Sequence, residues 1–392
     1  VDNEYYFKRW QMYGHFDDCE PFAYFSRAII ETPGQLDWAP DIIHCNDWQT
    51  ALVPVYLLEE KYRIPQLGST KTVFTIHNIE YQGRYGDQVL EDVIGLDRSY
   101  FNEGMLAYHR DVNLMKGAIM ASSFVTTVSP TYAQELRTPF YAHGLDGVIN
   151  QQSGKLQGIL NGIDTQLYDP AANPGLACNY TFKTLDKGKA ACKQALQQAV
   201  GLQENPDVPI IACVSRLVGH KGFSLVTDAL HEMMALNIQM VVLGTGDWQY
   251  EEAFRHAQSQ YPGRFTAQLT YSAPLSTMIY AGADLFLMPS VSEPCGLSQM
   301  IAMRFGTIPV VRETGGLKDT VTPYNKFDGT GRGFTFSNIS AGDMLWVLRE
   351  AVDLYHNNKK AWRGLQKESM SADFSWTNSA KQYLDIYQRI LG

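Results

Sequence analysis

Short runs of β-branched and apolar residues alternate with segments of helical periodicity along most of this 392-residue chain. This alternation is typical of βαβ units, in which crossover helices join parallel strands. Because helices cover both faces of a parallel sheet, the pattern restricts the chain to a layered α/β fold. The chain is longer than the commonest single core, so we expect two α/β domains.

In the first half of the chain, β-branched residues predict strands at 39–44, 72–76 and 124–128. Residues 79–112 are polar and rich in Gly and Tyr, which predicts a long active-site loop with short helices. The first domain is therefore expected to span residues 1–160.

The second half repeats the scheme more cleanly. An apolar stripe predicts a helix at 222–236, and a second domain is expected over 165–372. A last helix within 373–392 is expected to pack back on the first domain. Five apolar runs predict the strands of the second sheet, namely 209–214, 239–243, 265–269, 284–288 and 307–311.

Charge and composition exclude several classes of function. Lys and Arg number 32 against 41 Asp and Glu, a net charge of −9, and no basic stripe favours nucleic acid. No run of 18 apolar residues predicts a membrane span. The six cysteines and nine histidines show no metal-binding spacing, so we expect free thiols and no metal site. A phosphate-bearing ligand would therefore be held by a few cations in a cleft.

The most informative segment follows the predicted strand 284–288. Glu293 lies on this loop, and Gly296 lies where a helix is expected to begin, so backbone N–H groups there can hold a diphosphate while Glu293 reaches sugar hydroxyls. The pattern leaves a second interpretation open, in which Glu293 only favours the helix N-terminus by its charge.

Two further strand-to-helix turns carry candidates for phosphate binding. Arg216 and Lys221 lie five residues apart on one loop. The planar guanidinium of Arg216 can donate two parallel hydrogen bonds to a diphosphate, and the ammonium of Lys221 can add a compact positive charge. Gly315 and Gly316 form a turn that lets the backbone approach a phosphate. The alternatives are a solvated loop for Lys221 and an ordinary tight turn for the glycines.

In the first half, Asp47 and His77 each follow a predicted strand. Because carboxyl ends of parallel strands meet at one edge, the two residues make a plausible sugar and acceptor site in a cleft between the domains. The residues alone also allow Asp47 to be a helix N-cap and His77 to be a core histidine.

Eight segments together resemble one family. They occur in the order HCNDW, FTIHNIEYQG, TTVSPTYAQE, GILNGID, VSRLVGHKG, SEPCGLSQ, GTIPVVRETGGL and DFSW, and they resemble the bacterial glycogen synthases and plant starch synthases over essentially the whole chain. The resemblance implies the GT-B glycosyltransferase fold, with two facing Rossmann-like domains. It also implies that glucose moves from ADP-glucose to the non-reducing end of an α-1,4-glucan, glycogen or starch, with retention of configuration.

The same resemblance implies roles for individual residues. Glu293, His77 and Asp47 are implied to be catalytic or to hold the sugar at the reacting centre, with no metal and no cofactor other than the donor substrate ADP-glucose. Asn78, Asn161 and Tyr24 are implied to bind sugar or acceptor. Residues implied to bind the donor are Arg216, Lys221, Tyr271, Cys295, Gly296, Leu297, Thr314, Gly315 and Gly316.

The chain departs from the family pattern at two places. Family members begin with a strand and a Lys-Thr-Gly-Gly-Leu-type loop, which nothing here matches, so the resemblance implies a first domain without its N-terminal part. Strands 39–44 and 72–76 are then expected to lack partners. Retaining transferases of the wider class also carry a second Glu eight positions after the first, where this chain has Ile301.

Two other functions remain open from the sequence. One is a related glycosyltransferase that uses UDP-glucose, and the other is a non-catalytic glucan-binding or regulatory remnant. The resemblance predicts the cytoplasm of a bacterium as the location, with a plastid as the alternative.

Overall fold

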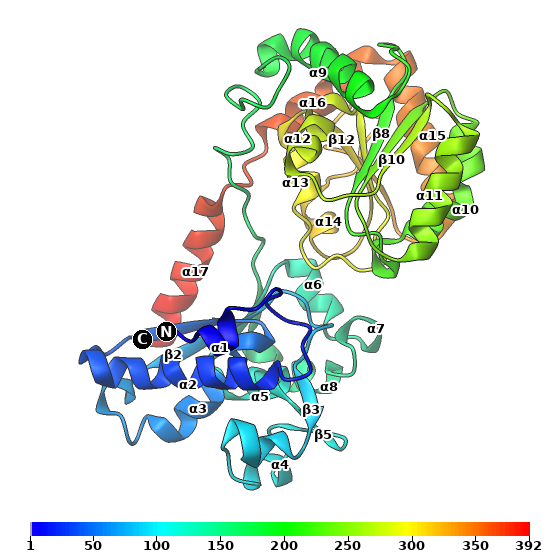
Figure 1. Ribbon diagram of the computed structural model, residues 1–392. Helices are drawn as coiled ribbons and strands as arrows, with labels where there is room; N and C mark the ends of the chain where they lie inside the picture. The colour runs from blue at the N-terminus through cyan, green and yellow to red at the C-terminus, as the bar shows by residue number, and fades with distance from the viewer. Residues whose placement is uncertain (1) are drawn as a thin grey trace. The chain divides into compact units, whose positions relative to one another are not determined.

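The computed structural model describes residues 2–392, which form two compact units (Figure 1). Unit 1 comprises the chain up to Leu160 together with Ala380–Gly392, and unit 2 comprises Asn161–Ser379. Each unit contains one parallel sheet with helices against it. The predicted α/β class is confirmed.

The sheet of unit 1 has the strand order β1-β2-β6-β7, and its strands are all parallel. The strands are β1 (Ile42–Asn46), β2 (Lys71–Ile76), β6 (Phe124–Thr127) and β7 (Leu156–Gly158). The expectation that 72–76 lacks a partner is wrong, because β1 and β6 flank β2 on its two sides. Within the described residues, β1 pairs only with β2 and is an edge strand. β7 was not predicted, because its Leu-Gln-Gly sequence lacks β-branched residues.

Several helices surround this sheet, and a second, small sheet lies in the predicted long loop. The helices with the largest buried faces are α2 (Cys19–Leu36), α3 (Leu52–Glu60), α5 (Leu114–Ala121) and α6 (Pro130–Glu135). Shorter helices are α1 (Glu4–Phe7), α4 (Ser99–Asn102), α7 (Pro139–Ala142) and α8 (Asp146–Gln151). The prediction for 79–112 was incomplete, because β3 (Arg84–Gly86), β5 (Asp111–Asn113) and β4 (Ala107–Tyr108) form an antiparallel sheet there.

The sheet of unit 2 is parallel and has the order β10-β9-β8-β11-β12-β13. All five predicted strands are present, within a residue or two of the expected ends. The missed sixth strand, β13, is only three residues long. The strands are β8 (Ile210–Val214), β9 (Gln239–Leu243), β10 (Phe265–Gln268), β11 (Leu285–Met288), β12 (Ile308–Arg312) and β13 (Phe334–Phe336).

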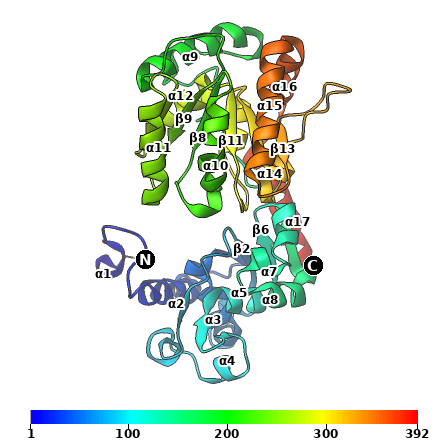
Figure 2. The ribbon, with the colours of Figure 1, turned by 90° about the vertical axis from the view of Figure 1, so that its right-hand side faces the viewer.

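Helices lie on both faces of the second sheet (Figure 2). One face is covered by α10 (Phe223–Met234), α11 (Trp248–Gln260) and α15 (Ala341–Asn357). Side chains of these helices pack against alternate strand residues, such as Ile211 and Val242, and form one hydrophobic core. On the other, α9 (Leu185–Val200) packs on α12 (Ala273–Gly282). Three more helices complete the unit: α13 (Ser298–Arg304), α14 (Gly315–Thr320) and α16 (Lys359–Ser371).

The last helix, α17 (Trp376–Leu391), passes from unit 2 into unit 1. Its Ile386 is buried against Val73 and Phe124 of the first sheet and against Ile159, which directly follows β7. Its Tyr387 hydroxyl lies 2.6 Å from His44 Nδ1. These contacts make α17 part of the core of unit 1.

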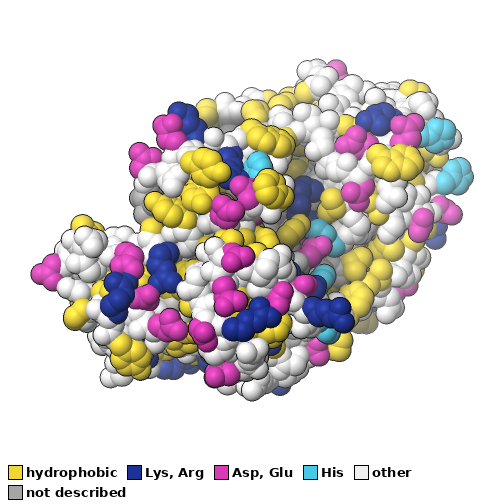
Figure 3. Space-filling model, turned by 60° about the horizontal axis from the view of Figure 1, so that its bottom comes forward, with side chains coloured by type: hydrophobic (Ala, Val, Ile, Leu, Met, Phe, Trp, Pro, Cys, Tyr) yellow, Lys and Arg dark blue, Asp and Glu magenta, His cyan; other side chains and the backbone are white. Residues whose placement is uncertain are grey.

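The surface carries charges of both signs. On the face drawn in Figure 3, Lys and Arg side chains are interspersed with Asp and Glu, and apolar side chains also reach the surface. No helix in residues 2–392 combines the length and apolar character needed to cross a membrane. All six cysteines in this part of the chain are free thiols.

Candidate functional site

Two neighbouring strands of unit 1 end in polar residues at the same edge of the sheet. Asp47 follows β1 and His77 follows β2, and these strands are paired in parallel. The backbone N–H of His77 donates to Asp47 Oδ1 at 2.8 Å, and His77 Nε2 lies 2.9 Å from Asn46 Oδ1. The structure therefore brings together the two predicted residues of this half.

The backbone of Asp47 has a conformation that glycine favours, with φ 55° and ψ −178°. Asp47 occupies the N-cap position of the 3₁₀ turn Trp48–Thr50, but within the described chain its side chain makes no capping hydrogen bond. The interpretation of Asp47 as a helix cap is therefore wrong. Its carboxylate holds the amide of His77 instead, and backbone strain of this kind clusters at functional sites.

Two titratable groups near this edge have shifted pKa values. Burial raises the pKa of Asp47, while the His77 ring and the amide N–H groups of His77 and Asn78 act in the opposite direction. Burial also lowers the pKa of His44 to about 4, with a further contribution from His77. Such shifts are frequent at functional sites, although buried structural groups show them as well.

The other two predicted residues of unit 1 lie in different surroundings. Asn78 Oδ1 accepts a hydrogen bond from the N–H of Glu80 at 3.0 Å and so forms a tight turn directly after β2. Tyr24 lies on α2 and lines a separate hollow of about 410 Å³ with Tyr6 and Arg27. That hollow shares no lining residue with the Asp47–His77 pair, so the structure does not bring Tyr24 into this cluster.

Unit 2 contains a buried ion pair between two predicted site residues. Glu293 lies on the loop after β11 and is 6% exposed. Lys221 Nζ donates to both of its carboxylate oxygens, at 2.8 and 2.7 Å, and the Ser290 hydroxyl donates to Oε2 at 3.0 Å. Charge-assisted hydrogen bonds of this kind fix the position of the carboxylate. The interpretation of Lys221 as part of a solvated loop is therefore wrong. The ion pair also shows that Glu293 does more than favour a helix N-terminus by its charge.

Close backbone contact between two loops makes the ion pair possible. The carbonyl of His220 accepts hydrogen bonds from the N–H groups of Val291 and Ser292 at 2.9 and 3.3 Å. Gly222 has φ 74°, and a Cβ there would lie 2.0 Å from the carbonyl oxygen of Pro289. Glycine is therefore required at 222 for the loop of Lys221 to approach the loop of Glu293.

The Gly-Gly turn after β12 also packs against the loop of Glu293. The N–H of Gly316 donates to the carbonyls of Glu293 and Pro294 at 3.2 and 3.1 Å, and a Cβ on Gly316 would lie 2.0 Å from the carbonyl oxygen of Cys295. Gly315 begins α14, and Thr314 is its N-cap residue. Gly316 thus stabilises the loop of Glu293 through its backbone N–H.

Arg312 is a positioning residue that was not predicted from the sequence. It is 4% exposed, and its guanidinium donates to the carbonyls of Ser290 and Val291 at 2.7 and 2.6 Å. An arginine directly after the predicted apolar strand 307–311 was the available signal, because a buried guanidinium needs several acceptors. Arg312 fixes the loop that positions Glu293.

The residues that follow Glu293 differ in exposure. Burial raises the pKa of the Cys295 thiol to about 12, which favours a backbone role over a nucleophilic one. Gly296 has φ 70°, and the side chain of Leu297 is exposed. Asn161 Oδ1 is buried and has no hydrogen-bond partner in the described part of the chain.

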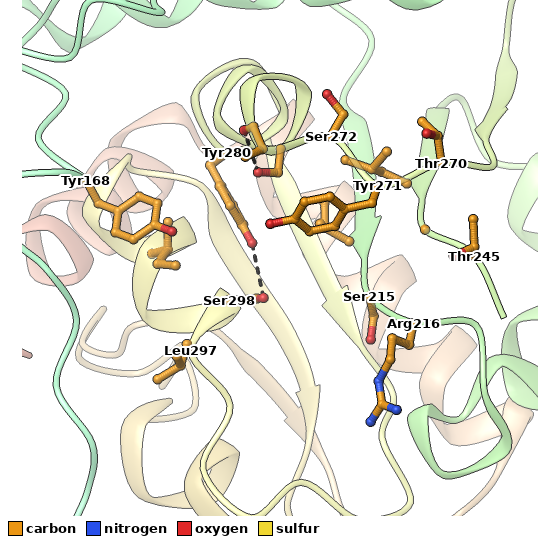
Figure 4. Close-up of a pocket in the computed structure, with 16 residues that line it drawn as sticks. Tyr168, Ser215, Arg216, Thr245, Thr270, Tyr271, Ser272, Tyr280, Leu297 and Ser298 are labelled. Atoms are coloured by element: carbon orange, nitrogen blue, oxygen red, sulfur yellow. Dashed lines mark hydrogen bonds between the residues drawn. The ribbon is translucent and has the colours of Figure 1, made fainter. Parts of the chain in front are cut away.

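A cavity of about 370 Å³ opens at the carboxyl ends of β8, β9 and β10 (Figure 4). The ring of Tyr271 is 90% exposed, and Tyr168 and Tyr271 point toward each other across the cavity with Tyr280 between them. Among residues 2–392 the guanidinium of Arg216 has no ion-pair or hydrogen-bond partner. Leu297, from the loop of Glu293, lines the same cavity. Arg216, Tyr271 and Leu297 thus come together as predicted donor residues.

Several residues that line this cavity were not anticipated. Ser215, Thr245 and Thr270 each lie just after a strand of the parallel sheet, which was the signal that could have identified them. Tyr280 donates to Ser298 Oγ at 3.1 Å from within the cavity wall. In the described residues no group of three His, Cys, Asp or Glu side chains is arranged to hold a metal ion.

Two family models match the chain, one in each half. Residues 1–151 match the starch synthase catalytic domain, and residues 197–361 match the glycosyl transferases of group 1.

Proteins named glycogen synthase match along the whole chain. The sequence is 49% identical over 392 residues to one from Geobacillus thermodenitrificans, covering 100% of this chain and 80% of that protein. It is 47% identical over 391 residues to one from Streptococcus mutans, covering 100% of this chain and 82% of that protein.

A solved structure agrees with these sequence matches. The catalytic domain of starch synthase IV from Arabidopsis thaliana, bound to ADP and acarbose, aligns with a TM-score of 0.90 at 40% identity over 98% of this chain and 79% of that one. A sucrose-phosphate synthase from Thermosynechococcus elongatus aligns with a TM-score of 0.59 at 19% identity and supports the fold alone. The chain belongs to the glycogen and starch synthase family of glycosyltransferases.

Proposed function

We propose that this chain transfers glucose from ADP-glucose to the non-reducing end of an α-1,4-glucan with retention of configuration. The observation that carries the proposal is the buried Glu293–Lys221 ion pair, held on a loop that also lines an open cavity. Relatives named glycogen synthase, and a related starch synthase structure bound to ADP, support this substrate class.

The donor is proposed to bind in the cavity of unit 2. Its volume of about 370 Å³ lies within the range of small-ligand pockets. The exposed Tyr271 ring offers a flat face for stacking of the adenine base. Arg216, whose charge is not compensated, is available to the diphosphate as a fork of N–H donors.

Glu293 and Lys221 are proposed to act at the transferred glucose. In the reaction the bond between the anomeric carbon and the diphosphate oxygen breaks, and its electron pair leaves with ADP. The acceptor hydroxyl forms the new bond to that carbon, and its proton passes to the departing diphosphate oxygen. Lys221 and Arg216 would stabilise the charge that develops on the diphosphate, and Glu293 would accept hydrogen bonds from the sugar hydroxyls.

The Asp47–His77 pair of unit 1 is proposed to bind hydroxyl groups of the sugar. The pair offers a carboxylate oxygen and a ring nitrogen at neighbouring strand ends, and the strained backbone of Asp47 supports a role beyond folding. Side chains alone are proposed to stabilise the charge that develops on the diphosphate, without a metal ion, as the sequence predicts.

The test is transfer of labelled glucose from ADP-glucose to glycogen by purified chain 1–392. We expect incorporation that an α-1,4-specific glucosidase releases, that EDTA leaves unchanged and that excess UDP-glucose does not suppress. Glu293→Gln, prepared in parallel, controls for contaminating enzymes. Incorporation from UDP-glucose alone, or equal incorporation by Glu293→Gln, would reject the proposal.

A further inference from the structure

A row of four hydrogen-bonded side chains runs across the sheet of unit 1, close to the strand ends that carry Asp47 and His77. At one end of the row, the Tyr387 hydroxyl of α17 lies 2.6 Å from Nδ1 of His44 on β1. His44 Nε2 lies 2.6 Å from Oγ1 of Thr75 on β2. Thr75 Oγ1 in turn lies 2.6 Å from Oγ1 of Thr126 on β6, at the other end. The row thus joins the C-terminal helix to three neighbouring strands.

The hydrogen bonds of this row suit a neutral imidazole. Burial lowers the pKa of His44 to about 4, so its ring is neutral at pH 7, where one ring nitrogen donates and the other accepts. A hydroxyl group can do both, so all the bonds can run in the same direction along the row. Thr75 and Thr126 are fully buried, and hydrogen bonds strengthen one another in such surroundings. The row therefore fixes the position of Thr75.

The backbone that follows Thr75 makes direct contact with the proposed sugar site. The carbonyl of Thr75 accepts the N–H of Asp47 at 2.9 Å. The peptide group between Ile76 and His77 is bonded on both sides. Its carbonyl accepts the Thr127 hydroxyl at 2.7 Å, and its N–H donates to Asp47 Oδ1 at 2.8 Å. The end of β2 therefore determines where both Asp47 and His77 lie.

The backbone conformation of Asp47 explains why such support matters. Its φ of 55° lies in the left-handed region, which is costly for a residue with a side chain. A strained conformation persists only where the surrounding structure determines it more than once. Two of these restraints come from the end of β2, one on the N–H of Asp47 and one on its carboxylate. A shift of Thr75 would weaken both restraints.

We propose that the row positions the Asp47–His77 pair for sugar binding, so that Tyr387 influences glucose transfer from α17. Tyr387 and His44 are positioning residues in this proposal, because they act through Thr75 and need not touch the sugar. The inference rests on the proposed function for the role of the pair. It gives α17 a part in the reaction in addition to its part in the core of unit 1.

The test compares Tyr387→Phe with Tyr56→Phe in the full chain. Both variants remove one hydroxyl hydrogen bond from unit 1, because the Tyr56 hydroxyl donates to the carbonyl of Ile94 at 2.8 Å. In Tyr387→Phe we expect kcat/KM for transfer to glycogen to fall roughly three- to ten-fold, the factor for one neutral hydrogen bond. Its affinity for ADP should be unchanged in calorimetry, because the nucleotide is proposed to bind in unit 2. Tyr56→Phe should change neither quantity.

Hydrogen exchange provides a measurement that does not depend on activity. The amide of His77 should exchange roughly three- to ten-fold faster in Tyr387→Phe, because its acceptor Asp47 is less firmly placed. It should exchange at the wild-type rate in Tyr56→Phe. Thr126→Val removes the hydroxyl at the opposite end of the row, on β6, and should change kcat/KM and exchange in the same direction as Tyr387→Phe.

Equal losses of kcat/KM in Tyr387→Phe and Tyr56→Phe would overturn the inference, because the effect would then be one of stability. Wild-type kinetics and wild-type exchange of the His77 amide in Tyr387→Phe would also overturn it. So would an effect that Thr126→Val does not share, because packing of α17 and not the row would then act on the pair. If the wild type transfers no glucose, the proposed function fails, and exchange of the His77 amide alone decides whether the row positions the pair.

Discussion

At the scale of single residues, the proposed chemistry of unit 2 depends on a carboxylate and an ammonium buried side by side. Lys221 compensates the charge of Glu293, and Ser290 adds a neutral hydrogen bond. Removing either charge leaves the other buried without its partner, which is far more costly than removing a surface pair. Arg216, by contrast, is exposed and lines the cavity proposed to bind the donor.

Replacing Glu293 by Gln preserves the shape of the side chain and removes its charge. We expect kcat to fall by roughly 10²–10³-fold, the usual loss for one electrostatic contact at a reacting centre. Affinity for ADP should be maintained or increase, because Lys221 is released toward the phosphates. Radiolabel assays and calorimetry measure the two quantities. Ser290→Ala is the milder control, and near-normal turnover of Glu293→Gln would contradict the assignment.

Replacing Arg216 by Ala removes a cation that has no ion-pair or hydrogen-bond partner in residues 2–392. We expect the affinity for ADP to fall by roughly ten-fold or more, because hydrogen bonds to charged groups contribute about 1.5–3 kcal/mol. Arg216→Lys should restore only part of that affinity, since Lys lacks the planar fork. The control is Arg255→Ala, whose side chain pairs with Glu251 and Glu252 on α11. Unaltered ADP binding by Arg216→Ala would place the donor elsewhere.

The positions of these residues could be predicted from the sequence, but the contacts between them could not. Glu293, Lys221, Asp47 and His77 each follow a strand, and period and composition are enough to find strand ends. The Lys221–Glu293 pair joins residues 72 positions apart, and it depends on loop contacts that no local pattern encodes. Tyr24 was predicted by resemblance alone and lies in a separate hollow.

At the scale of elements, the loops after β8, β11 and β12 pack directly against one another. Gly222 and Gly316 lie where these loops touch, and a side chain at either position would meet a backbone carbonyl at 2.0 Å. A backbone carbonyl cannot move aside as a flexible side chain can. The loops must therefore separate if either glycine is replaced.

Gly316→Ala should destabilise unit 2 by about 1–3 kcal/mol, the usual cost of overpacking. It should also shift Glu293, because Gly316 N–H donates to the carbonyl of that residue. Urea unfolding measures the first effect and kcat the second. Gly342→Ala on α15 is the control, because its Cβ would have only an ordinary contact at 3.6 Å. Equal midpoints for the two variants would contradict the packing argument.

The contact of β1 with α17 predicts a dependence of stability on pH. Burial lowers the pKa of His44 to about 4, below its usual value near 6.5. Between these values the unfolded chain binds a proton that the folded chain excludes, so stability should fall as the pH drops from about 6.5 to about 4. The expected loss from this residue is on the order of 1–3 kcal/mol.

Urea unfolding at several pH values measures this loss, and His44→Gln should flatten the curve across that window. His256→Gln, which removes an exposed histidine of α11, should leave the curve as in the wild type. A curve for His44→Gln that falls as steeply as that of the wild type would show that other groups cause the acid sensitivity.

The strands and helices of unit 2 were predicted well, and those of unit 1 less so. β9 is a continuous apolar run and α10 has a strong apolar period, whereas β7 and β13 are three residues long, too short for a pattern to identify them. The antiparallel sheet at 84–113 was missed because its strands are only two or three residues long. Short elements of this kind are formed by tertiary contacts and not by local preference.

At the scale of the whole molecule, the surface of unit 1 near α1 and α2 exposes many apolar residues. The side chain of Phe16 is 99% exposed and that of Trp10 82% exposed. In the described chain, β1 also has a strand partner on one side only. Exposed aromatic side chains and an edge strand both favour association between copies.

We therefore expect the apparent mass of chain 1–392 to rise with protein concentration in sedimentation velocity. Trp10→Ser combined with Phe16→Ser should reduce this association, because it removes apolar surface without disturbing the core. Trp248→Ser, which removes an equally exposed aromatic residue of unit 2, should not. A concentration-independent monomer in the wild type would contradict the expectation.

The path of α17 has a consequence for the order in which the protein can be completed during synthesis. Residues 380–392 belong to unit 1 but leave the ribosome after all of unit 2. Until then the apolar surface around Val73, Phe124 and Ile159 lacks Ile386, and His44 lacks Tyr387. Unit 2 is continuous in sequence and can fold first, since domains generally fold as units as they emerge. The core of unit 1 would therefore be completed only after residues 380–392 have been synthesised.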